Sequence, residues 1–276
     1  MSLKSQLRTT VKGALRHVVL GLSYTLDSRG KYTKTWPRIL TYHGVCDEPV
    51  DEWSVTPAQL REQMRYVAAE CRPVALEDLV AWIRGEKADL PEQAVAVTFD
   101  DGYLDVLTTA APILAEFTVP ATAFVASGLI SGRPPHASYV PTRPFMSWAQ
   151  VRELQAAGFT IGSHAQTHPV LSGLSWDDAL RELRDSKTEL EQQLGRAVEM
   201  LAYPYGTKRA VSGRERQMAR EVGYAAAFID ATAHVSKASD LFALPRNKVL
   251  HTDSLAVVKA SLAGRMDAWQ WVENRS

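Results

Sequence analysis

Two adjacent carboxylates, Asp100 and Asp101, stand directly after the apolar run AVAVTF at 94–99 and directly before Gly102. Neighbouring carboxylates repel each other, which disfavours their charged forms unless a cation offsets the repulsion. A bound metal ion would let one aspartate act as a ligand while the other remains a base. The same pair could instead cap the N-terminus of a helix, because Asp is common there. The pair alone leaves both interpretations open.

Two histidines four residues apart, His164 and His168, follow a second apolar run, FTIGS at 159–163. Histidines with this spacing can share one face of a helical turn and bind the same metal ion. The spacing alone is weak evidence for a metal site, because histidines at this spacing are at least as often ordinary surface or core residues. Two histidines and one aspartate would leave one coordination position open, as a catalytic zinc site requires and a structural zinc site does not.

A third segment of this kind, AYPYG at 202–206, also follows an apolar run. Pro204 and Gly206 favour a sharp turn, and such a turn can direct a backbone N–H into a pocket. Taken alone, the segment favours an ordinary structural turn over a functional one.

The elements that precede these residues must position them. Short apolar runs bounded by polar or turn residues predict buried strands at 38–42, 94–99, 121–126, 159–163, 200–204 and 224–229. Amphipathic stretches predict helices from Thr56-Pro57 to about Glu70 and at about 76–86, 103–116, 147–157, 175–194, 213–222 and 254–264. Six or seven such units predict a parallel sheet with helices outside, closed or nearly closed into a barrel. The carboxyl ends of barrel strands form the catalytic rim, and all three polar segments stand at such ends.

The segment 131–146 has four prolines and no hydrophobic periodicity. Long loops without their own secondary structure are usually functional in compact domains. We therefore expect this segment to be a loop over the mouth of the barrel, not a linker between domains.

The composition limits the classes of function. The 276 residues include 31 basic and 31 acidic side chains, so the chain has no net charge. A dedicated nucleic-acid binder is normally basic, so we expect no nucleic-acid partner. Cys46 and Cys71 cannot build a disulfide framework and suit reduced thiols in a cytoplasmic protein. No run of 18 apolar residues occurs, and the N-terminus lacks a clear signal-peptide cleavage site. We expect a cytoplasmic protein.

The N-terminal segment 1–35 differs from the rest of the chain, 36–276, in its charge. Its first 34 residues hold seven Lys and Arg against Asp27 alone. Within it, residues 3–26 carry apolar side chains at helical spacing, flanked by Arg8, Lys12 and Arg16. This pattern predicts a basic amphipathic helix that either packs on the barrel or contacts an anionic membrane surface. The second alternative would place the protein at the inner face of the membrane.

Together and in this order, TFDDG (98–102), SHAQTH (163–168) and AYPYG (202–206) resemble the signatures of the NodB-like polysaccharide deacetylases, carbohydrate esterase family 4. The resemblance covers about residues 37–250. It implies a distorted (β/α) barrel with about seven parallel strands, here preceded by the amphipathic helix. It also implies a divalent ion, usually Zn²⁺ with Co²⁺ or Ni²⁺ as alternatives, held by Asp101, His164 and His168. Asp100 would then be the general base.

The resemblance also assigns roles around the third signature. The backbone N–H of Tyr205 would help to stabilise the oxyanion, and Tyr203 would contact the substrate. The family often has Arg where this chain has Ala202, so another residue must orient Asp100. Arg246, in LPRNKV, is the candidate, and it could also contact the substrate.

The general acid is less clear from the sequence, because the fourth family signature is not recognisable around Phe228-Ile229-Asp230. The last signature histidine could be His251 in VLHTD, although its surroundings match poorly. We favour His43, in LTYHGV at the end of the first predicted strand.

These features predict metal-dependent hydrolysis of an N-acyl group, most simply N-acetyl, from an amino sugar. The sugar could belong to a polysaccharide or be linked to a lipid. The alternatives are a deformylase or a hydrolase of small cyclic amides with the same fold, or a sugar-binding barrel without activity.

Overall fold

The computed structural model describes residue 18 and residues 37–267. The predicted segment 1–35, with its amphipathic helix over 3–26, therefore lies outside the described residues except at position 18. All statements below concern the part of the chain that is described.

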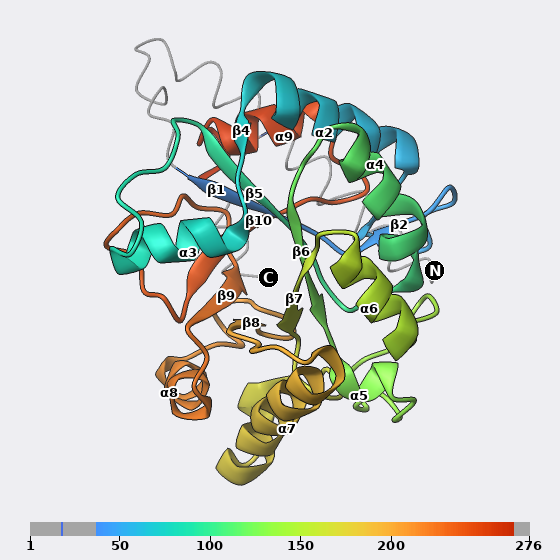
Figure 1. The fold of residues 1–276 in the computed structure, drawn as a ribbon, viewed down its shortest axis with the longest axis vertical. Helices are drawn as coiled ribbons and strands as arrows, with labels where there is room; N and C mark the ends of the chain where they lie inside the picture. Colours follow the sequence, from blue (N-terminus) through green and yellow to red (C-terminus); the bar gives the residue numbers. More distant parts are fainter. Residues whose placement is uncertain (1–17, 19–36, 268–276) are drawn as a thin grey trace.

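Seven parallel strands form a closed barrel, as the sequence predicts (Figure 1). They are β1 (Arg38–Tyr42), β5 (Ala94–Phe99), β6 (Ala121–Val125), β7 (Thr160–Ser163), β8 (Met200–Ala202), β9 (Ala226–Asp230) and β10 (Leu244–Lys248). The barrel closes because β1 pairs in parallel with both β5 and β10. The short β4 (Arg72–Pro73) pairs with the start of β5. A separate parallel pair, β2 (Gly44–Val45) and β3 (Ser54–Val55), follows β1.

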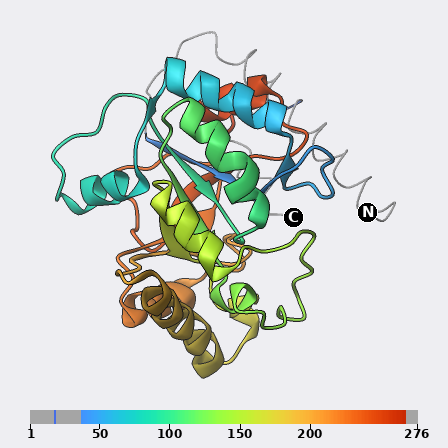
Figure 2. The same ribbon diagram turned by 45° about the vertical axis from the view of Figure 1, so that its right-hand side comes forward.

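Helices surround the barrel (Figures 1 and 2). They are α2 (Pro57–Glu70), α3 (Leu76–Arg84), α4 (Ala111–Glu116), α5 (Ser127–Ile130), α6 (Trp148–Ala156), α7 (Trp176–Leu194), α8 (Gly213–Val222) and α9 (Leu255–Leu262). A π-helical turn, η1 (Val106–Ala110), leads into α4, and a 3-10 turn, η2 (Leu171–Gly173), precedes α7. Thr56 and Ser147 each form a capping box with the glutamine three residues on, so α2 and α6 begin where the sequence predicts.

Side chains alternate between the two faces of each strand, and this alternation separates two apolar layers. Ile39, Ala96, Phe124 and Phe228 belong to an inner cluster that α3 also joins. The strand residues between these positions belong to the larger cluster under the outer helices. The same period of two carries the inner face from Ala96 through Thr98 to Asp100, and from Phe228 to Asp230. The inward-facing residues are therefore apolar in the first part of these strands and polar at their carboxyl ends.

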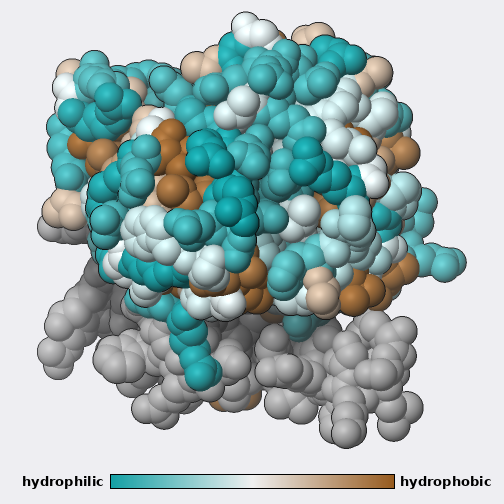
Figure 3. Space-filling model, turned by 90° about the horizontal axis from the view of Figure 1, so that it is seen from below, coloured by the Kyte–Doolittle hydropathy of each residue, from teal (hydrophilic) through white to brown (hydrophobic). Residues whose placement is uncertain are grey.

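The described surface is mostly hydrophilic on the face seen from below, where hydrophobic residues form small separate patches (Figure 3). Large exposed hydrophobic side chains include Val50 and Val140, both in loops. Among the residues described, no helix has the length and hydrophobicity needed to cross a bilayer.

Candidate active site

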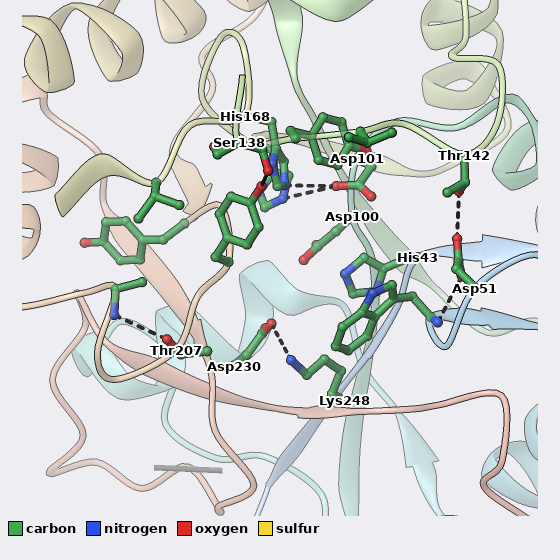
Figure 4. Close-up of a pocket in the computed structure, with 18 of the residues that line it drawn as sticks. His43, Asp51, Asp100, Asp101, Ser138, Thr142, His168, Thr207, Asp230 and Lys248 are labelled. Carbon is green, nitrogen blue, oxygen red and sulfur yellow. Dashed lines mark hydrogen bonds and ion pairs between the residues drawn. The ribbon is translucent and has the colours of Figure 1, made fainter. Parts of the chain in front are cut away.

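A pocket of about 660 Å³ opens at the carboxyl ends of the barrel strands. It collects most of the site residues predicted from the sequence, which are His43, Asp100, Asp101, His164, His168, Tyr203 and Tyr205. In Figure 4, Asp100 lies between one group formed by Asp101 and His168 and another formed by His43, Asp230 and Lys248. The pocket is therefore a single site in which these residues can act together.

Asp101, His164 and His168 converge deep in this pocket. The Asp101 Oδ1 atom lies 3.4 Å from His164 Nε2 and 3.3 Å from His168 Nε2. One ligand atom from each residue falls within 4.8 Å of the other two, and all three side chains are buried. Burial raises the pKa of Asp101, but the two histidines outweigh burial and hold this pKa well below its ordinary value.

The segment that joins the two histidines differs from the predicted helical turn. Residues 164–168 form an irregular loop after β7, with Ala165 at φ 60° and His168 at φ 59°. Asp101 and Tyr205 also have left-handed backbones, at φ 74° and 61°. Non-glycine residues in this region are strained and cluster at functional sites. The histidines meet because the loop reverses sharply, not because they share a helix face.

His164 is oriented by a hydrogen bond of its second ring nitrogen. Its Nδ1 lies 2.8 Å from the carbonyl oxygen of Ala202. A carbonyl can only accept, so Nδ1 carries the proton and Nε2 of the neutral ring keeps a free lone pair. Such a bond fixes the tautomer that a metal ligand needs. Ala202 thus contributes its main chain to the site.

The donor set fits a divalent metal ion. The separations of 3.3 and 3.4 Å from Asp101 Oδ1 to the histidine nitrogens match the ligand spacing of about 3.3 Å expected for tetrahedral zinc with bonds of about 2.0–2.1 Å. Asp101 Oδ1 is also buried without a hydrogen-bond partner among the described residues. A buried acceptor of this kind requires a cation or another partner. Two neutral imidazoles and one carboxylate would leave a fourth position for water or substrate.

Asp100 faces a different partner from Asp101. The two guanidinium nitrogens of Arg246 donate to the two Asp100 carboxylate oxygens, each at 2.7 Å. Arg246 Nη2 also donates to Asp230 at 3.1 Å, and its side chain is fully buried. The structure thus places Arg246 where it can orient Asp100. Arg246 is not among the residues that line the pocket, so this position does not give it a direct contact with substrate.

The two candidate acids occupy different places. His43 lines the pocket, its ring is 5.5 Å from that of Trp53, and its buried Nδ1 has no hydrogen-bond partner among the described residues. His251 does not line the pocket. Its backbone N–H donates to Glu52 and its carbonyl accepts from Gln59. Of the two histidines, the structure brings only His43 to the other site residues.

The third signature forms the tight turn that its Pro and Gly predict. Gly206 N–H donates to the Tyr203 carbonyl oxygen at 3.0 Å, and Asp230 N–H donates to the Gly206 carbonyl oxygen at 2.7 Å. A Cβ atom on Gly206 would lie 2.9 Å from Asp230 N, so the close approach needs glycine. Tyr203 borders the pocket, but its hydroxyl donates to the Phe242 carbonyl oxygen at 3.1 Å. The Tyr205 hydroxyl donates to the Ser138 carbonyl oxygen.

The loop 131–146 does lie at the mouth of the barrel. It contributes Ser138, Tyr139, Val140, Thr142 and Arg143 to the pocket lining. Tyr139 places its ring 4.0 Å from that of His168 and thereby covers a candidate metal ligand. Arg143 and Thr142 bond to Asp51 in the loop before β3, which ties the two loops together.

Sequence reasoning missed several residues of the pocket. Asp230 and Lys248 form an ion pair at 3.2 Å, and the Lys248 ammonium lies 4.5 Å from the centre of the Trp53 ring. Asp230 ends β9, so its place after an apolar run was the available signal. Lys248 ends β10, which is too polar to be recognised as a strand, and Trp53 stands in an irregular segment.

Comparison with known proteins identifies the sequences that resemble this chain. Residues 87–227 match the family model described as polysaccharide deacetylase. Poly-β-1,6-N-acetyl-D-glucosamine N-deacetylase of Escherichia coli strain K12 is 28% identical over 260 residues, covering 80% of this chain and 38% of that protein. The match therefore spans less than half the length of that relative.

Solved structures share the fold. The Streptococcus pyogenes deacetylase PplD, solved with acetate, has a TM-score of 0.72 and 24% identity, covering 83% of this chain and 99% of its own. IcaB from Ammonifex degensii has a TM-score of 0.71 and 23% identity, covering 84% of this chain and 97% of its own. At this level of identity, the likeness supports the closed barrel and its order of elements.

Proposed function

Because the chain belongs to the polysaccharide deacetylase family, we propose that it hydrolyses the N-acetyl group of an amino sugar within a glycan, with a divalent metal ion as cofactor. The observation that carries this proposal is that the two adjacent aspartates have different partners. Asp101 joins two histidines in a set that fits a metal ion, while Asp100 is held by Arg246 in the same pocket. A barrel that only binds sugar would need neither arrangement.

Asp101, His164 and His168 would hold the ion, and zinc suits their donor atoms best. When bound, such an ion polarises an amide carbonyl and makes water more acidic. All other tasks fall to residues of the chain itself.

Asp100 is placed to accept the proton of the attacking water. General-base catalysis requires a carboxylate fixed within hydrogen-bond reach of its target. The paired bonds from Arg246 fix the plane of the Asp100 carboxylate. Since Asp101 faces the histidines, the two carboxylates need not compete for one role.

His43 is placed to protonate the departing amine. Its ring lies in the pocket near Asp100, and its Nδ1 is free of other partners among the described residues (Figure 4). Acid catalysis matters here because an amine is a poor leaving group unless it is protonated. In this scheme the backbone N–H of Tyr205 would bind the oxygen that becomes negative. The left-handed conformation of Tyr205 supports a special backbone role for this residue.

The Escherichia coli relative is a poly-β-1,6-N-acetyl-D-glucosamine N-deacetylase, and its substrate guides the choice for this chain. We propose oligomers of N-acetylglucosamine as the first substrates to test. A pocket of about 660 Å³ is large enough for a sugar unit with its acetamide. A sugar carried on a lipid remains a second form in which the same unit could be presented.

The test is release of free amine and acetate from β-1,6- and β-1,4-linked oligomers, with N-acetylglucosamine monosaccharide as a size control. Wild-type protein loaded with Zn²⁺ should act on at least one oligomer, and a chelator should abolish turnover. Asp100→Asn should retain Zn²⁺ and lose about 10²–10⁴-fold in kcat. Full activity of this variant would rule out the assigned base. Lack of activity on every oligomer by the loaded wild type would reject the proposed substrate.

A further inference from the structure

The loop between the two histidines needs support from outside itself. Ala165 and His168 both have positive φ values, at 60° and 59°. This conformation is strained for any residue that has a Cβ atom. The loop would relax if nothing held it, and relaxation would separate the two imidazoles.

Helix α7 supplies that support through Glu182. Its Oε2 atom accepts hydrogen bonds from the backbone N–H groups of Gln166 and Thr167, both at 2.9 Å. Its Oε1 atom accepts from the Thr167 hydroxyl at 2.7 Å. A single carboxylate therefore binds two consecutive amides and a side chain of the three-residue stretch that separates the histidines.

Other hydrogen bonds to the loop involve different backbone groups from those that Glu182 binds. Ser186, one turn later on α7, donates to the Ala165 carbonyl oxygen at 2.9 Å. From the start of α5, the N–H of Gly128 donates to the Gln166 carbonyl oxygen at 3.0 Å. These bonds hold carbonyl groups, whereas Glu182 holds amides. Helix α7 contacts both β7 and α5, so it is anchored beside the loop it braces (Figure 1).

We propose that Glu182 is a positioning residue for the metal site, which acts by fixing the conformation that lets His164 and His168 bind the same ion. The inference rests on the proposed metal dependence. Hydrogen bonds to an ionised acceptor are about twice as strong as neutral ones, and here three converge on one group. Glu182 does not reach the pocket and would touch neither metal nor substrate.

The test measures Zn²⁺ affinity of the full chain by competition with a chromophoric chelator, after metal has been removed. Glu182→Ala should raise the Zn²⁺ Kd about 10–100-fold, the usual effect of removing a residue that orients metal ligands. Glu182→Gln should lose less, because its amide oxygen can still accept from both backbone N–H groups. Thermal unfolding of the metal-free proteins shows whether each variant is folded.

Glu191 provides a matched control on the same helix. Its carboxylate also accepts from a backbone N–H, that of Val198 at 3.0 Å, but this loop carries no candidate ligand. Glu191→Ala should leave the Zn²⁺ Kd unchanged even if it lowers the unfolding temperature. Equal Zn²⁺ affinity of wild type and Glu182→Ala would overturn the inference and leave the metal site intact. A wild-type chain that takes up no Zn²⁺ would overturn both.

Discussion

Arg246 and Asp100 come from strands that are far apart in the sequence, yet their side chains form a two-pronged ion pair with both nitrogen–oxygen distances at 2.7 Å. The pair is buried, with Arg246 fully inaccessible and Asp100 2% exposed. It also recruits Asp230, which accepts from the same guanidinium at 3.1 Å. The geometry of the candidate base thus depends on a residue that does not border the pocket.

Arg246→Lys should lower kcat by up to about a hundredfold, the effect expected when a reacting group is misplaced by about 1 Å. Lysine keeps the charge but cannot bind both carboxylate oxygens in one plane. Metal content should stay at the wild-type level, because Asp101 and the histidines are untouched. Lysine is preferred to alanine, since leaving a buried charge unpaired costs about 3–5 kcal/mol of stability. Steady-state kinetics with metal analysis is the measurement, and unchanged kcat would exclude the positioning role.

His43→Ala should reduce turnover far more than His251→Ala, without changing metal content. A general acid typically contributes about 10²–10⁴-fold, and only His43 lies in the pocket. The backbone hydrogen bonds of His251 do not involve its imidazole, so alanine would preserve them. Turnover of both variants on the same oligomer decides between them. The opposite ranking would make His43 a packing residue beside Trp53.

Asp105→Asn should stabilise the protein at pH 8 and have little effect at pH 4. Burial raises the pKa of Asp105 to about 6, while Arg143 lowers it only in part. Both Asp105 carboxylate oxygens are buried, and Arg143 Nε lies 3.1 Å from one of them. Because the folded-state pKa exceeds the unfolded value of 3.8, the wild type loses stability as pH rises between these values.

The stabilisation from Asp105→Asn should therefore grow through this window and level off above pH 6. The stabilisation should be about 3 kcal/mol, because the pKa of Asp105 is about 6 in the folded protein and 3.8 in the unfolded chain. Chemical denaturation of both proteins at several pH values measures it. Asp51→Asn is the contrasting variant, because hydrogen bonds and Arg143 outweigh burial and lower the pKa of Asp51. A constant difference between wild type and Asp105→Asn at every pH would contradict the assignment.

Residues 3–26 should bind the 276-residue chain to vesicles that contain anionic lipid. The flanking Arg and Lys residues can each contribute about 1 kcal/mol near such a surface, and salt should weaken the effect. Co-sedimentation with anionic and neutral vesicles at low and high salt is the measurement. Deletion of residues 1–30 should remove binding while the unfolding temperature is kept. If this deletion unfolds the barrel instead, the segment is part of the fold.

The fold could be predicted largely because its strands end in recognisable signals. Six of the seven barrel strands appear as apolar runs, and Thr56 and Ser147 mark their helices by capping. Strand β10 could not be found in this way. Its sequence LPRNK places Arg246 and Asn247 in buried positions, where a buried ion pair and hydrogen bonds replace the usual apolar side chains. Periodicity detects hydrophobic burial and has no signal for a charged residue buried with its partner.

The site could be predicted where its residues are adjacent in the sequence at the end of one strand, as Asp100 and Asp101 are. It was not predictable where long-range contacts decide the geometry. The spacing of His164 and His168 favours a helical turn, but the left-handed backbone of Ala165 and the bonds to Glu182 produce a loop. Tyr139 reaches His168 from the loop over the barrel mouth, and no local pattern announces such an approach.

The closure of the barrel has a consequence for how such sites can change over time. The resemblance to the family implies an arginine at the position of Ala202, whereas here the guanidinium comes from β10. In a closed barrel, the inward-facing positions of different strands surround one centre. A guanidinium can therefore come from another strand and still reach the same carboxylate. The position of the charge in space would then stay the same while its position in the sequence changes. Searches that score signatures only in linear order would read such a relocation as loss of function.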